Sequence, residues 1–149
     1  MTVRSGLEDD LDDVIALVEH LFTPPGGRPA GYEAAAARER ARWWLASDDR
    51  ALLLAHAADG VAAGYCAVAV DIESIRFGRR AWVEDLVVRA DARSEGHGAA
   101  LLTAARAFAR ERGCTHLELD TANTRTEAQR FYDREGGTQG SLVYGWLVV

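Results

Sequence analysis

The sequence predicts a mixed α/β (α+β) fold, in which a largely antiparallel sheet carries helices on both faces. Two observations favour it. Amphipathic stretches with 3.6-residue spacing alternate with short apolar runs, and two of those runs are joined by Asp59-Gly60. A length of 149 residues and a hydrophobic fraction of 48% suit one compact domain over residues 1–149. We find no internal repeat or linker that would divide it.

A short strand and two helices are expected first. Val3 opens the strand, and Asp9 or Asp10 caps the first helix. The apolar positions of this helix share one face: Leu11, Val14, Ile15, Val18, Leu21 and Phe22. Proline and glycine make residues 23–31 a loop, and an alanine- and arginine-rich helix follows over residues 32–46.

An antiparallel pair of strands is predicted over residues 51–58 and 61–70, because Asp59-Gly60 suits the positive φ angles of a tight hairpin turn. A polar break over residues 71–80 precedes another strand at residues 81–88. A bend that contains two glycines, residues 93–98, then leads into an amphipathic helix that ends at Gly113. The order strand, glycine bend, helix is the part of the chain on which the functional interpretation depends.

Three shorter elements are expected in the last third of the chain. Leu117 and Leu119 alternate with polar neighbours, which predicts a strand. Thr126 and Gln129 form a capping box for a short helix that closes at Gly136-Gly137. Residues 142–149 are expected to form a final strand, which carries aromatic side chains and suggests pairing across a two-fold axis in a homodimer.

Composition and charge exclude several classes of function. The chain carries 17 basic and 23 acidic residues, a net charge of −6, and its basic residues are all arginine. This balance disfavours nucleic acid as a partner. Residues 1–6 lack an apolar signal core and no run approaches the length of a membrane span, so we expect a cytoplasmic protein with no membrane contact. Cys66 and Cys114 are interpreted as small buried hydrophobes, and the histidines show no metal-ligand spacing, so no metal is expected.

The most informative motif is Arg93-x-x-Gly96-x-Gly98 at the entrance of a helix. Glycines let backbone N–H groups crowd around an anion, and a helix N-terminus adds a partial positive charge, so the motif predicts a pyrophosphate site. A simple glycine-rich turn is the alternative interpretation. The longer dinucleotide-binding fingerprint is disfavoured, because position 101, where its third glycine would stand, is Leu.

A second motif is Ala128-x-x-Phe131-Tyr132-x-x-x-Gly136. With both motifs in this order, the chain resembles the GNAT (GCN5-related N-acetyltransferase) superfamily. The resemblance implies an acetyl-CoA-dependent transfer of an acetyl group to a primary amine of a small cationic molecule or peptide. It also implies a sheet that splays between residues 82–88 and 114–120, where the coenzyme enters.

The resemblance also implies which residues bind the coenzyme. The backbone of one strand would pair with the pantetheine arm, and the bend with the start of its helix would surround the pyrophosphate. The strand residues are Leu86, Val87 and Val88, and the bend residues are Arg93, Ser94, Glu95, Gly96, His97, Gly98 and Ala99. Relatives often hold the arm with an asparagine at the position of Arg125, and Asn123 is the substitute in this chain.

Catalytic roles follow from the same resemblance. Glu84 matches the group that takes the proton from the amine, and a hydrogen-bonded structural carboxylate is its alternative role. Strand alternation puts Glu84 and Asp85 on opposite faces, which leaves Asp85 to bind a cationic acceptor. Tyr132 matches the tyrosine that donates a proton to the coenzyme sulfur, with an aromatic core residue as the alternative.

The acceptor is the least defined part of the prediction. Tyr32, Trp43 and Trp44 either line its pocket or pack the second helix on the sheet. Asp71, Glu73 and Asp120 give the acceptor side an acidic character. Two rival functions remain: a non-catalytic sensor that binds CoA or acyl-CoA, and a binder of a mononucleotide-type phosphate ligand.

Overall fold

A computed structural model describes residues 1–148. The chain divides into two compact units, Met1–Leu119 and Asp120–Val149, and each is described by itself. Among the described residues, no helix is both long enough and apolar enough to cross a membrane.

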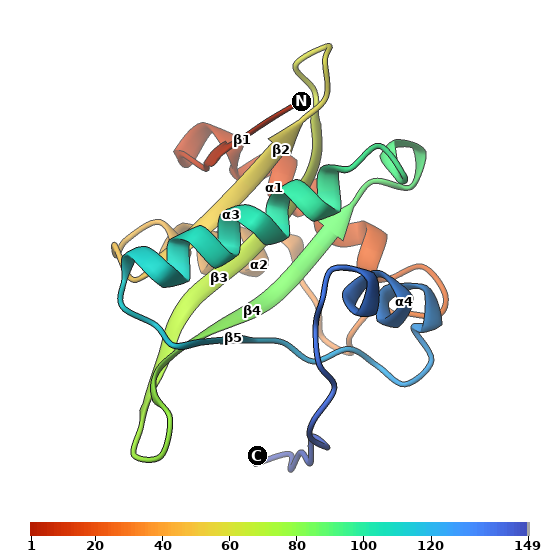
Figure 1. Cartoon of the computed structure of the whole chain (residues 1–149). Coiled ribbons are helices and arrows are strands. Elements are labelled where there is room, and N and C mark those ends of the chain that lie inside the picture. The colour runs from red at the N-terminus through yellow and green to blue at the C-terminus, as the bar shows by residue number, and fades with distance from the viewer. Residues whose placement is uncertain (149) are drawn as a thin grey trace. The chain divides into compact units, whose positions relative to one another are not determined.

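A five-stranded sheet forms the centre of the first unit (Figure 1). Its strands lie in chain order, and every neighbouring pair is antiparallel except β4 and β5, which are parallel. The strands are β1 (Thr2–Ser5), β2 (Arg50–His56), β3 (Ala62–Ser74), β4 (Gly78–Val88) and β5 (His116–Glu118). This confirms the predicted mixed, mostly antiparallel sheet.

The hairpin between β3 and β4 is longer than the sequence predicted. Residues 71–80, expected to be a polar break, extend both strands, and only residues 75–77 lie outside them. Charged side chains pair across this part of the hairpin, with 2.8 Å between Arg80 and Asp71 and 3.3 Å between Arg79 and Glu73. Such exposed cross-strand pairs give a strand a polar sequence that looks like a loop.

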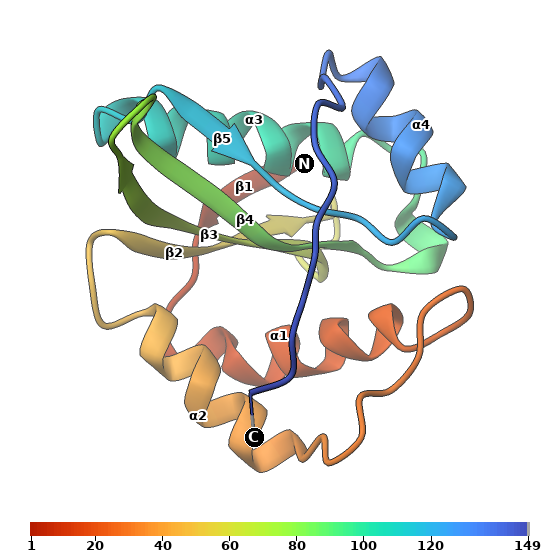
Figure 2. The ribbon, with the colours of Figure 1, turned by 90° about the horizontal axis from the view of Figure 1, so that it is seen from below.

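Helices cover both faces of the sheet (Figure 2). On one face α3 (His97–Glu111) buries Leu101, Ala105 and Phe108 against strand residues that include Cys66 and Val83. On the other face, the core around Leu54 and Tyr65 is covered by α1 (Leu11–Val18) and α2 (Ala34–Trp44). The two apolar layers hold β3 and β4 between them.

Asp10 caps a different turn from the predicted one. Its carboxylate accepts the N–H of Leu7 at 2.7 Å and pairs with Arg4 at 2.7 Å, so it closes the 3-10 turn η1 (Glu8–Asp10) that precedes α1. No side chain caps α1 itself. Two further 3-10 turns, η2 (Glu19–Leu21) and η3 (Ala90–Ala92), follow α1 and β4 respectively.

The second unit contains α4 (Thr126–Arg134), followed by Gly136 with a positive φ of 84°. The predicted capping box is wrong: Gln129 donates through its side-chain amide to the backbone oxygens of Ala122 and Asn123. Residues 142–148 form no strand, and residue 149 lies outside the described residues. An apolar sequence alone does not make a strand, because a strand needs a neighbour that accepts its backbone hydrogen bonds.

Candidate functional site

A β-bulge in the middle of β4 determines the geometry of the site. Asp85 pairs with Ala67, but the next residue of β3, Val68, pairs with Val83. Glu84 is therefore an inserted residue that has no partner of its own across the hairpin. A bulge of this kind bends the strand and changes the direction of the side chains beside it.

The bulge corrects the prediction that Glu84 and Asp85 lie on opposite faces. Trp82 is paired with Ala69 and Asp85 with Ala67, whereas Val83 belongs to the core under α3. Trp82 and Asp85 thus share the face that α1 and α2 cover, although strict alternation would separate residues three positions apart. Because Glu84 is inserted at the bulge, the alternation of side chains between the two faces of the sheet shifts by one residue after it.

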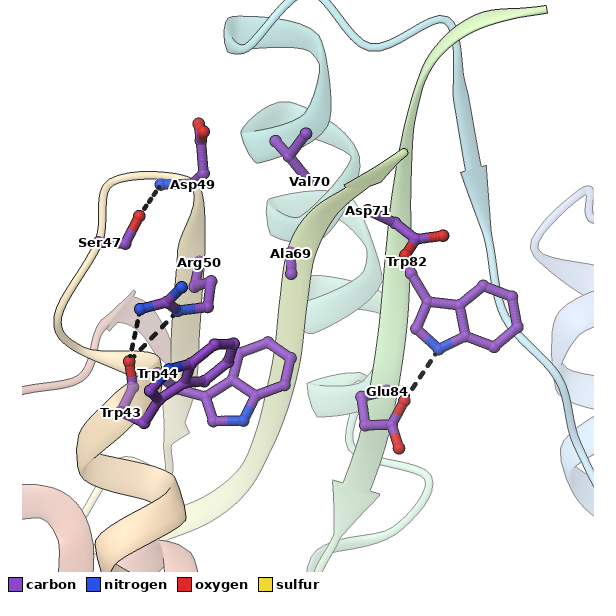
Figure 3. A pocket seen from close by; sticks show the side chains of 10 residues that line it. All are labelled: Trp43, Trp44, Ser47, Asp49, Arg50, Ala69, Val70, Asp71, Trp82 and Glu84. Carbon is purple, nitrogen blue, oxygen red and sulfur yellow. Dashed lines mark hydrogen bonds between the residues drawn. The ribbon is translucent and has the colours of Figure 1, made fainter. Parts of the chain in front are cut away.

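A cavity of about 510 Å³ opens on this face (Figure 3). Residues from the end of α2, the start of β2, β3 and β4 line it. They are Trp43, Trp44, Ser47, Asp49, Arg50, Ala69, Val70, Asp71, Trp82 and Glu84. Figure 3 shows the indole of Trp82 on one side of the sheet face and the side chains of Trp43 and Trp44 on the other.

Glu84 is exposed in this cavity and is held by a neutral donor. The indole Nε1–H of Trp82 donates to its Oε2 at 3.0 Å. Within Met1–Leu119 no arginine pairs with Glu84, whereas Asp71 pairs with Arg80. The carboxylate of Glu84 is therefore available to a cation or to a proton from a ligand.

Asp85 is held beneath the same bulge by a buried tyrosine. The hydroxyl of Tyr65 donates to Asp85 Oδ2 at 2.8 Å, and the Tyr65 side chain is only 1% exposed. Burial raises the pKa of Asp85, the hydrogen bond from Tyr65 lowers it in part, and the charge of Glu84 raises it. Burial also raises the pKa of Tyr65, which keeps the hydroxyl protonated as the donor.

Within Met1–Leu119, one edge of β4 is unpaired beyond the bulge. The parallel pairing with β5 is limited to residues 80–82 and 116–118, whereas β3 stays paired with β4 as far as Val88. Leu86, Val87 and Val88 therefore have one edge on which β5 supplies no hydrogen bonds. Here the sheet splays, as predicted, and an extended ligand can add to it as a further strand.

The glycine bend lies directly after this edge. Ser94 and Gly96 both have left-handed backbones, with φ angles of 65° and 87°, and α3 begins at His97. The first N–H groups of a helix have no acceptor inside it, so those of His97, Gly98 and Ala99 point out of the start of α3. The Arg93 side chain is exposed and lies 3.5 Å from the carbonyl oxygen of Val88.

A buried histidine supports the bend. His97 is 3% exposed, and its Nε2 lies 3.2 Å from the carboxylate of Glu95. The Glu95 side chain is mostly exposed, so its charge is turned toward solvent as well as toward His97. The bend thus combines outward-facing N–H groups with a rigid first turn, which is a suitable geometry for a phosphate group.

Two predicted site residues belong to the second unit. Tyr132 lies on α4, where its ring meets that of Phe131 edge to face at 5.3 Å. Asn123 precedes the helix, and its backbone oxygen accepts the Gln129 amide. Their roles remain the ones that the sequence motif predicts.

Sequence reasoning missed several residues of the cavity. It did not assign Trp82 a role, although the spacing of Trp82 and Glu84 in a strand was a usable signal. The partnership of Tyr65 with Asp85 had no signal, because it depends on the register of two strands. Tyr32 is not part of the cavity lining and packs against Phe22 at 4.8 Å.

Neither cysteine belongs to the lining of the cavity. Cys66 is buried, and burial followed by the charge of Asp85 raises the pKa of its thiol to about 12. Cys114 is only half-buried, which corrects the prediction that both are buried. Among residues 1–148, no three His, Cys, Asp or Glu side chains are grouped so as to hold a metal ion.

Comparison with known proteins finds a family and several proteins to which this chain is similar. The model of the family described as "Acetyltransferase (GNAT) family" matches residues 14–137. The streptothricin acetyltransferase of Streptomyces lavendulae is 36% identical over 101 residues, which are 65% of this chain and 51% of the relative. The aminoglycoside N(6')-acetyltransferase type 1 of Klebsiella aerogenes is 35% identical over 95 residues, 62% of each chain.

The chain therefore spans about half to two thirds of the length of these curated relatives. Among solved structures, the aminoglycoside 6'-N-acetyltransferase AAC(6')-IG of Acinetobacter haemolyticus superposes with a TM-score of 0.82. That comparison covers 100% of this chain and 99% of the other at 19% identity, so it establishes the fold alone.

Proposed function

The chain belongs to the acetyltransferase (GNAT) family, and on that premise we propose that it transfers an acetyl group from acetyl-CoA directly to a primary amine. The acceptor is a small cationic molecule or a peptide. One observation carries the proposal: the unpaired edge of β4 runs directly into the left-handed bend that opens α3. An extended thioester carrier with a diphosphate needs these two features in this order.

The residues present fit the coenzyme. The backbone of Leu86, Val87 and Val88 offers hydrogen bonds to the amide groups of the pantetheine arm. The N–H groups from Ser94 to Ala99 would surround the pyrophosphate, with Arg93 as a charge-assisted partner. Asn123 is the proposed further contact to the arm. Acetyl-CoA supplies an acyl carbon that is activated as a thioester.

Glu84 acts as the general base in this scheme. An ammonium must lose a proton before its nitrogen can form a bond to the acyl carbon, and Glu84 takes that proton within the cavity. Its position supports the role, because it is exposed to the cavity and, within Met1–Leu119, its hydrogen-bond donor is the neutral indole of Trp82. Asp85 lies half-buried beside it, and the proposed role of its charged form is to favour a cationic acceptor.

Tyr132 acts as the general acid. When the nitrogen–carbon bond forms, the carbon–sulfur bond breaks and the departing sulfur needs a proton. A phenol with an ordinary pKa of about 10 is a suitable donor to a thiolate whose ordinary pKa is about 8.5. The nitrogen loses its second proton as the amide forms, and that proton restores the phenol of Tyr132. The products are the N-acetylated amine and CoA with a free thiol, and the proton that Glu84 took passes to solvent. Direct transfer requires no acyl-enzyme, and the buried Cys66 is not suited to form one.

The relatives indicate the kind of acceptor. Their names assign streptothricin to one and the 6'-amine of aminoglycosides to another, and both are small polar molecules that carry amines. The cavity of this chain has three carboxylates and a single arginine in its lining, which suits an amine in its protonated form.

The experiment that tests the proposal has two steps. Titration calorimetry should detect binding of CoA and of acetyl-CoA, and thiol release should then be measured with a panel of primary amines at saturating acetyl-CoA. No binding of either molecule would overturn the proposal. Binding without thiol release for any amine would favour a CoA sensor, and stronger stabilisation by ATP than by CoA would favour a mononucleotide binder.

A further inference from the structure

Most of the carboxylates that line the cavity are paired with an arginine, so the cavity has fewer unpaired negative charges than carboxylates. Asp71 is paired with Arg80 at 2.8 Å, and Asp49 lies 3.4 Å from Arg79. Glu84 differs from both, because within Met1–Leu119 it has no arginine partner. Of the three carboxylates that line the cavity, Glu84 therefore carries the negative charge that no arginine of Met1–Leu119 compensates, and the far end of the cavity adds little to it.

The three indoles of the cavity also differ in what covers them. The guanidinium of Arg50 lies 3.5 Å from the centre of the Trp43 ring and covers one of its faces. Trp44 packs against the core under α1 and α2 and meets Trp43 edge to face at 5.9 Å. Within Met1–Leu119, no ring or guanidinium stacks on Trp82. Within that unit, the half-buried Trp82 is thus the aromatic wall of the cavity that no ring or guanidinium covers, and it lies beside Glu84.

We propose that Trp82 selects the acceptor: its indole face receives a ring of the acceptor, while its Nε1–H holds the Glu84 carboxylate at the amine carried on that ring. The acceptor class is a primary amine one or two carbons from a saturated or aromatic ring. A second cationic group is not required. This inference rests on the proposed function and names the acceptor class of the same site.

Both halves of the role follow from the geometry at the bulge. A flat indole attracts ring faces and cations, and a stacked pair is favoured over a flexible chain that must be ordered on binding. The hydrogen bond of 3.0 Å keeps the Glu84 carboxylate beside the indole that carries the ring. In the acceptor, the distance from the ring to the amine must therefore match the distance from the Trp82 indole face to the Glu84 carboxylate.

Two matched amines test the ring preference. Cyclohexylmethylamine and n-heptylamine have seven carbons and one charge each, and spermidine supplies the polycationic alternative. Binding to the full chain with CoA present is measured by calorimetry, and turnover with acetyl-CoA by thiol release. We expect the ring-bearing amine to bind about three- to tenfold more tightly than the linear one, the ratio that a stacked pair supplies.

Two substitutions separate the face of the indole from its N–H. Trp82→Leu should abolish the ring preference. Trp82→Phe should keep the preference but lower kcat for the ring-bearing amine, because the Glu84 carboxylate loses the donor that holds it beside the ring. Phe77→Leu, at the exposed tip of the hairpin, is the matched control and should change neither quantity.

The outcomes are distinguishable from failure of the proposed function. Equal affinity for the two seven-carbon amines, or a ring preference that survives Trp82→Leu, would overturn the inference. A preference for spermidine that Asp71→Asn abolishes would overturn it as well. A ring preference in binding that depends on Trp82, without thiol release from any amine, would support the acceptor class and refute the transfer.

Discussion

The hydrogen bond beneath the bulge allows a test of the electrostatics that does not depend on activity. Tyr65→Phe removes one hydroxyl from a side chain that is 1% exposed and leaves the ring in place. The lost bond is the 2.8 Å contact to Asp85. A hydrogen bond to a charged group contributes about 1.5–3 kcal/mol, so we expect the free energy of unfolding to fall by about 2 kcal/mol at pH 8. For a chain of this length the melting temperature should fall by about 4–8 °C.

The loss should depend on pH in a defined direction. Burial already raises the pKa of Asp85 in the folded protein, and the hydrogen bond from Tyr65 opposes that increase. The variant therefore raises the pKa further, and its folded state binds more protons than the unfolded chain does. Its stability falls as the pH rises from the ordinary pKa of an aspartate toward the raised value. Below both values Asp85 is protonated in either state, and the substitution should cost only about 1 kcal/mol.

Asp85→Asn is the matched control. The amide oxygen still accepts the Tyr65 hydroxyl but carries no charge, so Tyr65→Phe in that background should cost about 1 kcal/mol at every pH. Urea denaturation of the four proteins at pH 3 and pH 8 measures all of these differences. A loss that is the same at both pH values and in both backgrounds would refute the view that Asp85 is a half-buried carboxylate that is ionised at pH 8.

Four further substitutions test the site and the core. Glu84→Gln should lower kcat at neutral pH by about 10²–10⁴-fold without changing the Kd for CoA. Tyr132→Phe should also lower kcat, and its loss should be largest for acyl donors with poor leaving groups. Thiol release measures the turnover of both variants. Gly96→Val should weaken CoA binding and destabilise the chain by about 1–2 kcal/mol, because the backbone at Gly96 has a φ of 87°. The cost comes from the backbone and not from a clash, since an added Cβ meets only the end of the Met1 side chain. Calorimetry measures the binding and thermal melting the stability. Leu101→Ala should cost about 2–5 kcal/mol in urea denaturation, since Leu101 is fully buried between α3 and the sheet.

Much of the fold was predictable, because its apolar pattern is strong where the chain is buried. The helix that became α3 and the hairpin around Asp59-Gly60 were both predicted to within a few residues. Residues 71–80 were missed, because a hairpin exposed on both sides has no apolar alternation and its arginine–carboxylate pairs resemble a polar loop. Residues 142–148 gave the opposite error: they have an apolar sequence but form no strand.

The candidate site was harder to predict than the fold, because its geometry depends on one unpaired residue. Nothing in the local sequence from Trp82 to Asp85 distinguishes a regular strand from a bulged one. The difference lies in the pairing with β3, where two residues face the three residues from Val83 to Asp85. Strict alternation would turn one of the two carboxylates toward α3. The bulge instead lets an exposed carboxylate and a half-buried one lie on the same side of the sheet, so that the charge of Glu84 raises the pKa of Asp85. Removing the bulge would therefore turn one of these two carboxylates away from this side of the sheet.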